Sequence, residues 1–460
     1  MRPARRAHAP STVTGAGSGS LAWPRAAADW APAAVPVLLI YAAHVLAGAN
    51  RSILALILSA LTATILLVLL AIPSTGARIG RIRGLPFLAA AFALVVLAAL
   101  ASMTPWAPGG PHPLWTYTTA LGAVTVDRSR TLVEVFKLLG LAAMFLIGAM
   151  LGTSENAARR TRLLVLWLGA AFALLAFARP GNLDFPGRLM AGFGSPNSAG
   201  AVMASLAILS LPLLRRRPGA DPARGRWARV EALIAGAAPG VMLLLLFLVA
   251  LVLTASRGAM VSAALAVFAY LTLRLLIGRL NLKMAALWVG ALAVVGVGVV
   301  LAEGGVAVRR FGEISADANG RASIFAVHWD AFQRSPLMGY GLGSFDAVNK
   351  LMLRLPNYHV LQDVRAAHNV YLQWLEEAGI LGAAPMFACI GAILVLTALG
   401  LRVKRSSRPW ICALLAVDVV FLAHGVSDYA LQVPSIAAFW ALLLGLQLGM
   451  VSTAGRGAHH

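Results

Sequence analysis

The sequence predicts an all-α, polytopic integral membrane protein with about twelve transmembrane helices and one long helical segment outside the membrane, between the ninth and tenth spans. Hydrophobic residues make up 60% of the 460 residues, and charged residues only 12%. Apolar runs of about 20 residues, the length that a helix needs to cross a bilayer, recur along the chain. The loops between these runs are alternately rich and poor in arginine, as expected for loops on opposite sides of a membrane.

Composition and hydropathy divide the chain in order. Residues 1–32 are rich in Ala, Gly, Ser, Pro and Arg and are expected to form a disordered cytoplasmic tail. Residues 33–302 hold spans 1–9, and residues 378–452 hold spans 10–12. Residues 303–377 are too polar to span and form the long outer helical segment, and residues 453–460 form a second cytoplasmic tail. The predicted spans are about 33–49, 53–72, 85–102, 131–151, 163–178, 198–214, 232–253, 259–277, 284–302, 378–401, 410–424 and 434–452.

Arginine-rich loops set the orientation of these spans. With the N-terminus in the cytoplasm, the basic clusters all fall on the cytoplasmic side, around residues 78–83, 159–162, 215–229, 274–283 and 402–408. The opposite short loops hold few basic residues, namely Arg51, Arg128, Arg130, Arg179, Arg188 and Arg257. The same arrangement places Arg188, Arg257, Asp428 and the long outer segment together on the non-cytoplasmic side.

Several kinds of protein are disfavoured by composition and motifs. The net charge is +21, but the basic residues lie mainly in short loops, which favours orientation in a membrane over nucleic-acid binding. The two cysteines, Cys389 and Cys412, fall inside apolar spans and offer no disulfide framework or thiolate metal site. The chain has no Asp-x-Asp pair, Walker loop, His-Glu-x-x-His or Gly-x-Ser-x-Gly motif. We therefore expect no metal and no cofactor.

The outer segment has its own local pattern. Asn319-Gly320-Arg321 is typical of a turn that opens a helix, and Ser335-Pro336 should stop that helix after Arg334. The glycine-rich stretch around Tyr340 is expected to form a flexible turn. A second helix is predicted to carry His368 and to end at Gly379.

Three arginines differ from those that set orientation. Arg257 lies in a short break, flanked by Ser256 and Gly258, between two strongly apolar spans. Arg188 lies in a glycine-rich stretch before another span, and Arg321 opens the helix of the outer segment. Contact with lipid headgroups would also explain each of them. A planar guanidinium beside flexible backbone, however, matches phosphate oxygens in two-pronged hydrogen bonds, which favours an anion site.

His368 is the leading candidate for a general base. Asn369 and Gln373 lie within about one helical turn of it, just outside the membrane, where a neutral imidazole can accept a proton near pH 7. An interfacial histidine that only hydrogen-bonds in the headgroup layer is the alternative. His328 and His359 are substitutes in the same segment. Asp428, the one carboxylate of its loop, is a candidate for orienting a base or an acceptor.

In the same order along the chain, these motifs resemble the O-antigen ligase and polymerase superfamily. The resemblance rests on Thr254-Ala-Ser-Arg257-Gly258, on Gly320-Arg321 followed by Arg334-Ser-Pro-Leu-Met-Gly-Tyr340-Gly, and on Ala367-His368-Asn369-Val-Tyr-Leu-Gln373. It implies a metal-independent glycosyltransferase in the bacterial inner membrane, with its active site facing the periplasm. The implied donor is a glycan on undecaprenyl pyrophosphate, and for the ligases the acceptor is a sugar hydroxyl of lipid A-core. The resemblance also implies that His368 is the base and that Arg257 and Arg321 are essential.

We therefore expect an O-antigen ligase that works by single displacement with inversion, because no carboxylate nucleophile is visible. Arg188, Arg257 and Arg321 would hold the pyrophosphate, and Asn369, Gln373, Tyr340 and Asp428 are candidates for contacting the acceptor or supporting the base. An O-antigen polymerase and a protein O-oligosaccharyltransferase remain alternatives, although the single long outer segment favours the ligase. A lipid-linked glycan flippase would place charged residues at mid-membrane, where this chain has few, chiefly Glu134, Lys137 and Asp418.

Overall fold

The computed structural model describes residues 22–179, 187–214, 226–277, 290, 314–402 and 407–452. Within these ranges all regular secondary structure is helical, which confirms the all-α class. In the part of the chain that the structure describes, eight helices are long and apolar enough to cross a membrane, and two shorter apolar helical stretches cover residues 29–45 and 237–253. The chain is thus consistent with a polytopic membrane protein.

A helix overlies each predicted span except the ninth, about 284–302, which lies outside the described residues apart from Gly290. These helices are α1 (Ala22–Val45), α2 (Ser52–Ala71), α4 (Leu85–Ser102), α5 (Arg128–Gly152), α6 (Glu155–Phe177), α7 (Pro196–Ser210), α8 (Arg226–Leu253), α9 (Arg257–Leu276), α15 (Val370–Gly400), α16 (Arg408–His424) and α17 (Pro434–Ser452). The 3₁₀ turn Leu211–Leu214 continues α7 to the end of its predicted span.

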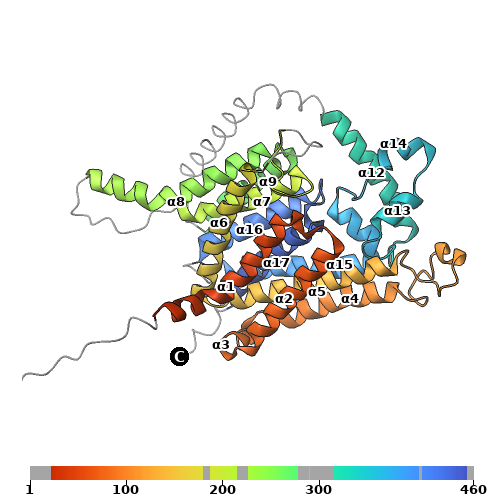
Figure 1. Ribbon diagram of the computed structural model, residues 1–460, viewed down its shortest axis with the longest axis horizontal. Coiled ribbons are helices and arrows are strands. Elements are labelled where there is room, and N and C mark those ends of the chain that lie inside the picture. Colours follow the sequence, from red (N-terminus) through yellow and green to blue (C-terminus); the bar gives the residue numbers. More distant parts are fainter. Residues whose placement is uncertain are drawn as a thin grey trace, which may run out of the picture.

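The last helix, α17, lies at the centre of the bundle, and nearly all its residues are buried (Figure 1). It packs closely on α5 through glycines of both helices. A Cβ atom added at Gly445 or Gly449 would collide with the α5 backbone, and one at Gly148 or Gly152 would collide with α17. Small residues allow two helix backbones to approach in this way where lipid supplies no hydrophobic drive for association.

The outer segment forms three helices that gather on one side of the bundle: α12 (Ile314–Arg334), α13 (Phe345–Leu351) and α14 (Tyr358–Leu361) (Figure 1). The predicted helix end at Arg334 is confirmed, but the predicted start at residues 319–321 is wrong. Gly320 and Arg321 lie inside α12, which begins at Ile314. Asn and Gly only weaken a helix, and packing of α12 against α15 outweighs their low propensity.

The second predicted helix of this segment also differs from the structure. His368 does not lie on a helix: its φ is 53°, and α15 begins two residues later, with Asn369 as its N-cap. Gly379 does not end the helix but breaks it, with φ 59° and ψ −174°, and α15 continues to Gly400. At this break the N–H groups of Ile380 and Leu381 donate to the carbonyls of Pro336 (2.8 Å) and Leu337 (3.0 Å). The outer segment is thereby attached to the membrane helix.

Candidate functional site

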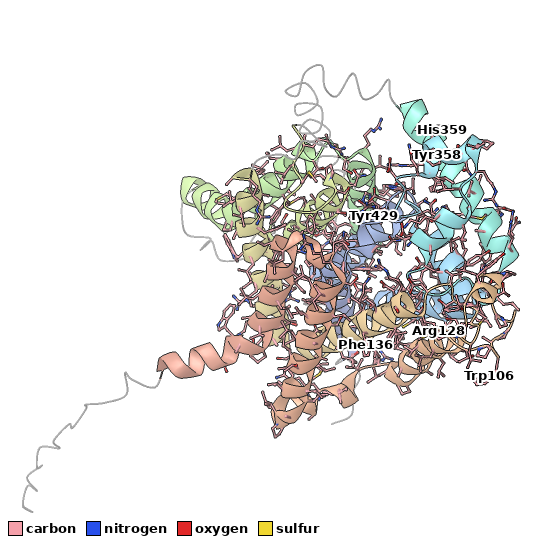
Figure 2. The ribbon with its side chains drawn as sticks, turned by 45° about the vertical axis from the view of Figure 1, so that its right-hand side comes forward. Trp106, Arg128, Phe136, Tyr358, His359 and Tyr429 are labelled. Carbon is pink, nitrogen blue, oxygen red and sulfur yellow. The ribbon has the colours of Figure 1, made fainter. Side chains whose placement is uncertain are left out.

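Polar groups from three distant parts of the chain meet around Asp428, which is buried in the loop after α16. Asn197 of α7 donates from Nδ2 to Asp428 Oδ2 at 2.6 Å, and the backbone N–H of Tyr429 donates to Oδ1 at 2.9 Å. His368 Nδ1 lies 3.9 Å from Oδ2, and His424 Nε2 lies 3.8 Å from Oδ1. Figure 2 labels Tyr429, beside this carboxylate, among the helices of the C-terminal half.

Two helix N-termini point toward this cluster. Ser195 caps α7 and Ser256 caps α9, each by accepting a backbone N–H. Glycines allow the close approach: a Cβ at Gly200 of α7 would touch Ser256, and one at Gly258 of α9 would lie 3.2 Å from His424 Nδ1. Helix N-termini carry partial positive charge, so their convergence favours an anion at this place.

The geometry of His368 suits a base that is held from one side. Its Nδ1 atom is buried and faces Asp428, whereas its side chain as a whole is 30% exposed. The ring stands edge-on to the ring of Tyr429, with 5.1 Å between their centroids. A carboxylate that favours the proton on Nδ1 leaves the Nε2 lone pair free to accept one. The ring can therefore present Nε2 to a substrate.

The three predicted arginines take different positions. Arg188 donates from Nε to the carbonyl of Thr254 (2.8 Å) and from Nη2 to the carbonyl of Ala255 (3.1 Å). It thus supports the turn that precedes Arg257, the first residue of α9. Arg321 of α12 lies close enough to His424 to act on it electrostatically. The structure therefore brings Arg188, Arg257 and Arg321 to the same cluster as His368.

Strained backbone marks the loops that carry these residues. Ala191, Ala255 and His368 have φ values of 51°, 48° and 53°, in the left-handed region that disfavours residues with a Cβ. Ala191 follows Arg188 by three positions, and Ala255 precedes Arg257 by two. Such conformations cost about 1–3 kcal/mol each and tend to occur at binding and catalytic sites.

The other predicted site residues have mainly local partners. The Asn369 side chain accepts the N–H of Leu372 and so caps α15. Gln373 is buried, and its Oε1 accepts the N–H of Ala367 at 3.0 Å. Tyr340 lies in a separate cluster, where its hydroxyl donates to the carbonyl of Ala331 at 3.0 Å. These bonds give Asn369 and Gln373 a part in holding the backbone on either side of His368, and they do not connect Tyr340 to it.

Sequence reasoning missed several residues of the cluster. His424 was not among the predicted site residues, although its spacing of four from Asp428 is a signal that could have found it. Asn197 had no distinguishing pattern, because its contact with Asp428 spans 231 positions. His328, considered only as a substitute base, is fully buried against Glu376. Nothing in the local sequence shows that these groups meet.

Charged groups within the spans have partners in the described bundle. Lys137 Nζ donates to Glu134 Oε1 at 2.6 Å. Asp418 accepts from Trp440 Nε1 (2.9 Å) and Gln447 Nε2 (2.8 Å). These contacts give each of the three charged groups a structural role. Among the residues that the structure describes, no group of three His, Cys, Asp or Glu side chains is placed to hold a metal ion.

A large apolar cavity adjoins the cluster. Its volume is about 870 Å³, and its walls come mainly from α4, α5, α15 and α17. Val370 and Gly425 line its end and are joined by a backbone hydrogen bond of 2.8 Å. They lie two residues after His368 and one after His424. Leu97 and Leu139, also in the wall, are exposed, so the cavity is open at this part of its wall.

The charge state of Asp428 leads to a first prediction. Burial alone would raise its pKa, but His368, His424 and the Asn197 donor favour the carboxylate and hold the pKa below its ordinary value. A lowered folded-state pKa contributes stability above the unfolded pKa of about 3.9, and this stability is lost as the pH falls through the folded pKa. We expect the stability advantage of the wild type over Asp428→Asn to shrink as pH falls from 6 to 3. Thermal unfolding of both proteins in detergent at several pH values measures this difference in stability. A difference that does not change with pH would contradict the prediction.

Comparison with known proteins adds one match. The family model described as O-antigen ligase matches residues 242–387, which run from α8 to α15 and include Arg257, Arg321 and His368. No curated protein matches the chain.

Proposed function

We propose that this protein transfers O-antigen glycan from undecaprenyl pyrophosphate to a sugar hydroxyl of lipid A-core. The match of residues 242–387 to the O-antigen ligase family model supports placing the chain in the O-antigen ligase and polymerase superfamily. The reaction would take place in the bacterial inner membrane, with the site facing the periplasm. The observation that carries the proposal is the His368–Asp428 pair, which lies near the N-terminus of α9 that begins at Arg257 and next to an apolar cavity.

In the proposed reaction, His368 Nε2 accepts the proton of the acceptor hydroxyl as that oxygen attacks the anomeric carbon of the donor. The bond from this carbon to the phosphate oxygen breaks, and its electron pair leaves with the pyrophosphate. Asp428, which faces Nδ1 at 3.9 Å, is proposed to orient the imidazole and to stabilise the imidazolium that forms. One displacement inverts the anomeric configuration, so a product of retained configuration would contradict this mechanism.

Arg257 and Arg321 are proposed to bind the pyrophosphate and to stabilise the charge that develops on it. Arg257 stands at the N-terminus of α9, where the helix dipole adds to its own charge. Arg188 is proposed to act mainly through the Thr254–Ala255 backbone, which its guanidinium supports. A positioned donor of this kind contributes about 3–4 kcal/mol to the transition state of a water-poor site.

The apolar cavity supports a lipid-linked substrate. A polyprenyl chain in the bilayer could enter it from the surface formed by Leu97 and Leu139, with its pyrophosphate near the end that Val370 and Gly425 line. A polar cluster at one end of an apolar cavity matches a substrate with a charged head and a long hydrocarbon tail. Membrane lipids are then the other partners of this surface.

Transfer in vitro tests the proposal directly. The purified protein is mixed with undecaprenyl-pyrophosphate glycan and lipid A-core in EDTA, and glycan on lipid A-core is the expected product. Longer glycan still on undecaprenyl would identify a polymerase, and glycan on added protein would identify an oligosaccharyltransferase. Movement of labelled donor across liposomes without any transfer would instead support a flippase.

Arg257 provides the sharpest test of the anion site. We expect Arg257→Ala to lower kcat by about 10²–10³-fold, because one positioned donor to the leaving group is lost. Arg257→Lys should recover only part of this, since an ammonium lacks the two-pronged geometry of the guanidinium. Arg51→Ala, on an exposed arginine of another predicted outer loop, is the matched control. An equal loss of kcat in Arg257→Ala and Arg51→Ala would point to an effect of surface charge alone.

A further inference from the structure

The segment that delivers His368 has no regular structure of its own. It runs from the end of α14 to the start of α15 and places His368 in a left-handed conformation. Its beginning is held by Asn349 of α13, whose Nδ2 donates to the carbonyls of Leu361 (2.8 Å) and Val364 (3.0 Å). The position of the base therefore depends on one buried amide.

Asn349 is in turn fixed by a buried histidine. Because both N–H groups of its amide serve backbone carbonyls, its oxygen faces His328 Nε2, at 3.3 Å. Nε2 must then carry a proton. The other ring nitrogen, Nδ1, lies 2.8 Å from Glu376 Oε2, so one further proton is shared between that nitrogen and the carboxyl group. Both side chains are 0% exposed, and the His328 ring stacks on Phe345 with 4.3 Å between centroids.

The far end of the segment is held by Gln373, which in turn contacts Glu377, the residue next to Glu376. Gln373 accepts the N–H of Ala367, one residue before His368, and donates from Nε2 to Glu377 Oε1 at 2.9 Å. Glu377 also accepts the N–H groups of Gly343 (2.8 Å) and Phe345 (3.2 Å) at the start of α13. Side chains of α15 thus act on both ends of the segment: Glu376 acts through His328 and Asn349 of α13, and Gln373, which Glu377 supports, acts directly on Ala367.

Resting on the proposed function, we propose that His328, Asn349 and Glu376 form a buried hydrogen-bonded relay that positions His368 for the transfer reaction. A buried pair of this kind often stabilises a protein no more than apolar residues of the same size. Its value here is geometric, because His328 links Glu376 to Asn349, and Asn349 holds the backbone that leads to the base. His328 is then a positioning residue, and it does not contact the substrate.

The relay predicts a specific pattern in two variants of His328. His328→Leu breaks the relay, whereas His328→Gln keeps an N–H group for Asn349. We expect His328→Leu to lower kcat by about 10²-fold with little change in KM, as for a misplaced catalytic group. His328→Gln should recover most of the rate. In a His368→Ala background His328→Leu should cost nothing further, because its effect acts through the base.

Hydrogen exchange of the full-length protein tests positioning without relying on transfer. Amides of residues 361–370 should exchange faster in His328→Leu and at the wild-type rate in His328→Gln. Val348→Ala, a buried packing change on α13 that leaves the relay intact, is the control for lost stability. If His328→Leu does not fold, Asn349→Ala removes the two donors to the segment and gives the same test.

The outcomes separate the two proposals. Unchanged exchange in His328→Leu, an equal loss of kcat in Val348→Ala, or an additive loss in the His368→Ala background would each overturn the relay. A wild type that transfers no glycan from undecaprenyl pyrophosphate would overturn the proposed function, and the exchange result would then decide on the relay by itself.

Discussion

Replacing His368 with alanine is expected to lower kcat for glycan transfer by about 10²–10⁴-fold, the usual contribution of a general base. The reason is that His368 has one ring nitrogen, Nδ1, facing the buried Asp428 at 3.9 Å, while its side chain as a whole is partly exposed. KM for the donor should change little, because the arginines, and not His368, are proposed to bind the pyrophosphate of the donor. Initial rates with varied donor concentration measure both constants.

Two variants make this test specific. His368→Asn keeps a side chain that tolerates the left-handed backbone but cannot act as a base, so it should lose as much activity as alanine. His359→Ala changes an exposed histidine on the outer edge of the same segment and should keep the wild-type rate (Figure 2). If His368→Ala keeps more than a tenth of the rate, or if His359→Ala loses as much, the assignment of the base is wrong.

Replacing Gly379 with alanine is expected to destabilise the protein by about 3 kcal/mol, because strain and overpacking add at one position. Its φ of 59° disfavours a residue with a Cβ, and the added atom would collide with the backbone of Leu337. The collision would separate α15 from the turn that ends α12. Thermal unfolding in detergent should show a lower midpoint for Gly379→Ala.

Gly391 in the same helix provides the matched control. A Cβ added there meets no atom within 4 Å among the described residues, and its backbone is helical. Gly391→Ala should therefore be neutral or stabilising by up to about 1 kcal/mol, because alanine favours a helix over glycine. Equal midpoints for Gly379→Ala and the wild type would show that the break in α15 tolerates a side chain.

Most of the fold could be predicted because the bilayer constrains it strongly. An apolar run of sufficient length has few choices but to form a helix, since its backbone polar groups find no water. The predicted ranges 85–102 and 434–452 coincide with α4 and α17 to the residue. The main errors lie in the outer segment, at residues 319–321 and at His368, and just after it, at Gly379. There water can satisfy the backbone, and packing against neighbouring helices decides where a helix begins or breaks.

The candidate site was predictable only in part. Residue type and the side of the membrane singled out Arg257, Arg321, His368 and Asp428, and the structure brings them together. The roles of these residues remain predictions until transfer is measured. Asn197 and the buried His328–Glu376 pair could not be found, because a hydrogen bond between residues 48 or 231 positions apart leaves no periodic trace in one sequence.

The sequence by itself determined the all-α class and the approximate positions of the spans, and it predicts the side of the membrane on which the unusual arginines and His368 lie. These follow from local hydropathy and from the distribution of charge, which each stretch of chain carries on its own. Only the tertiary structure decided that His368 leaves the helix, that Asp428 faces its Nδ1 atom and that a cavity adjoins the pair. Such features depend on which distant segments of backbone can approach one another. Small residues such as Gly200 and Gly258 permit a close approach, but the sequence does not show which segment they will contact.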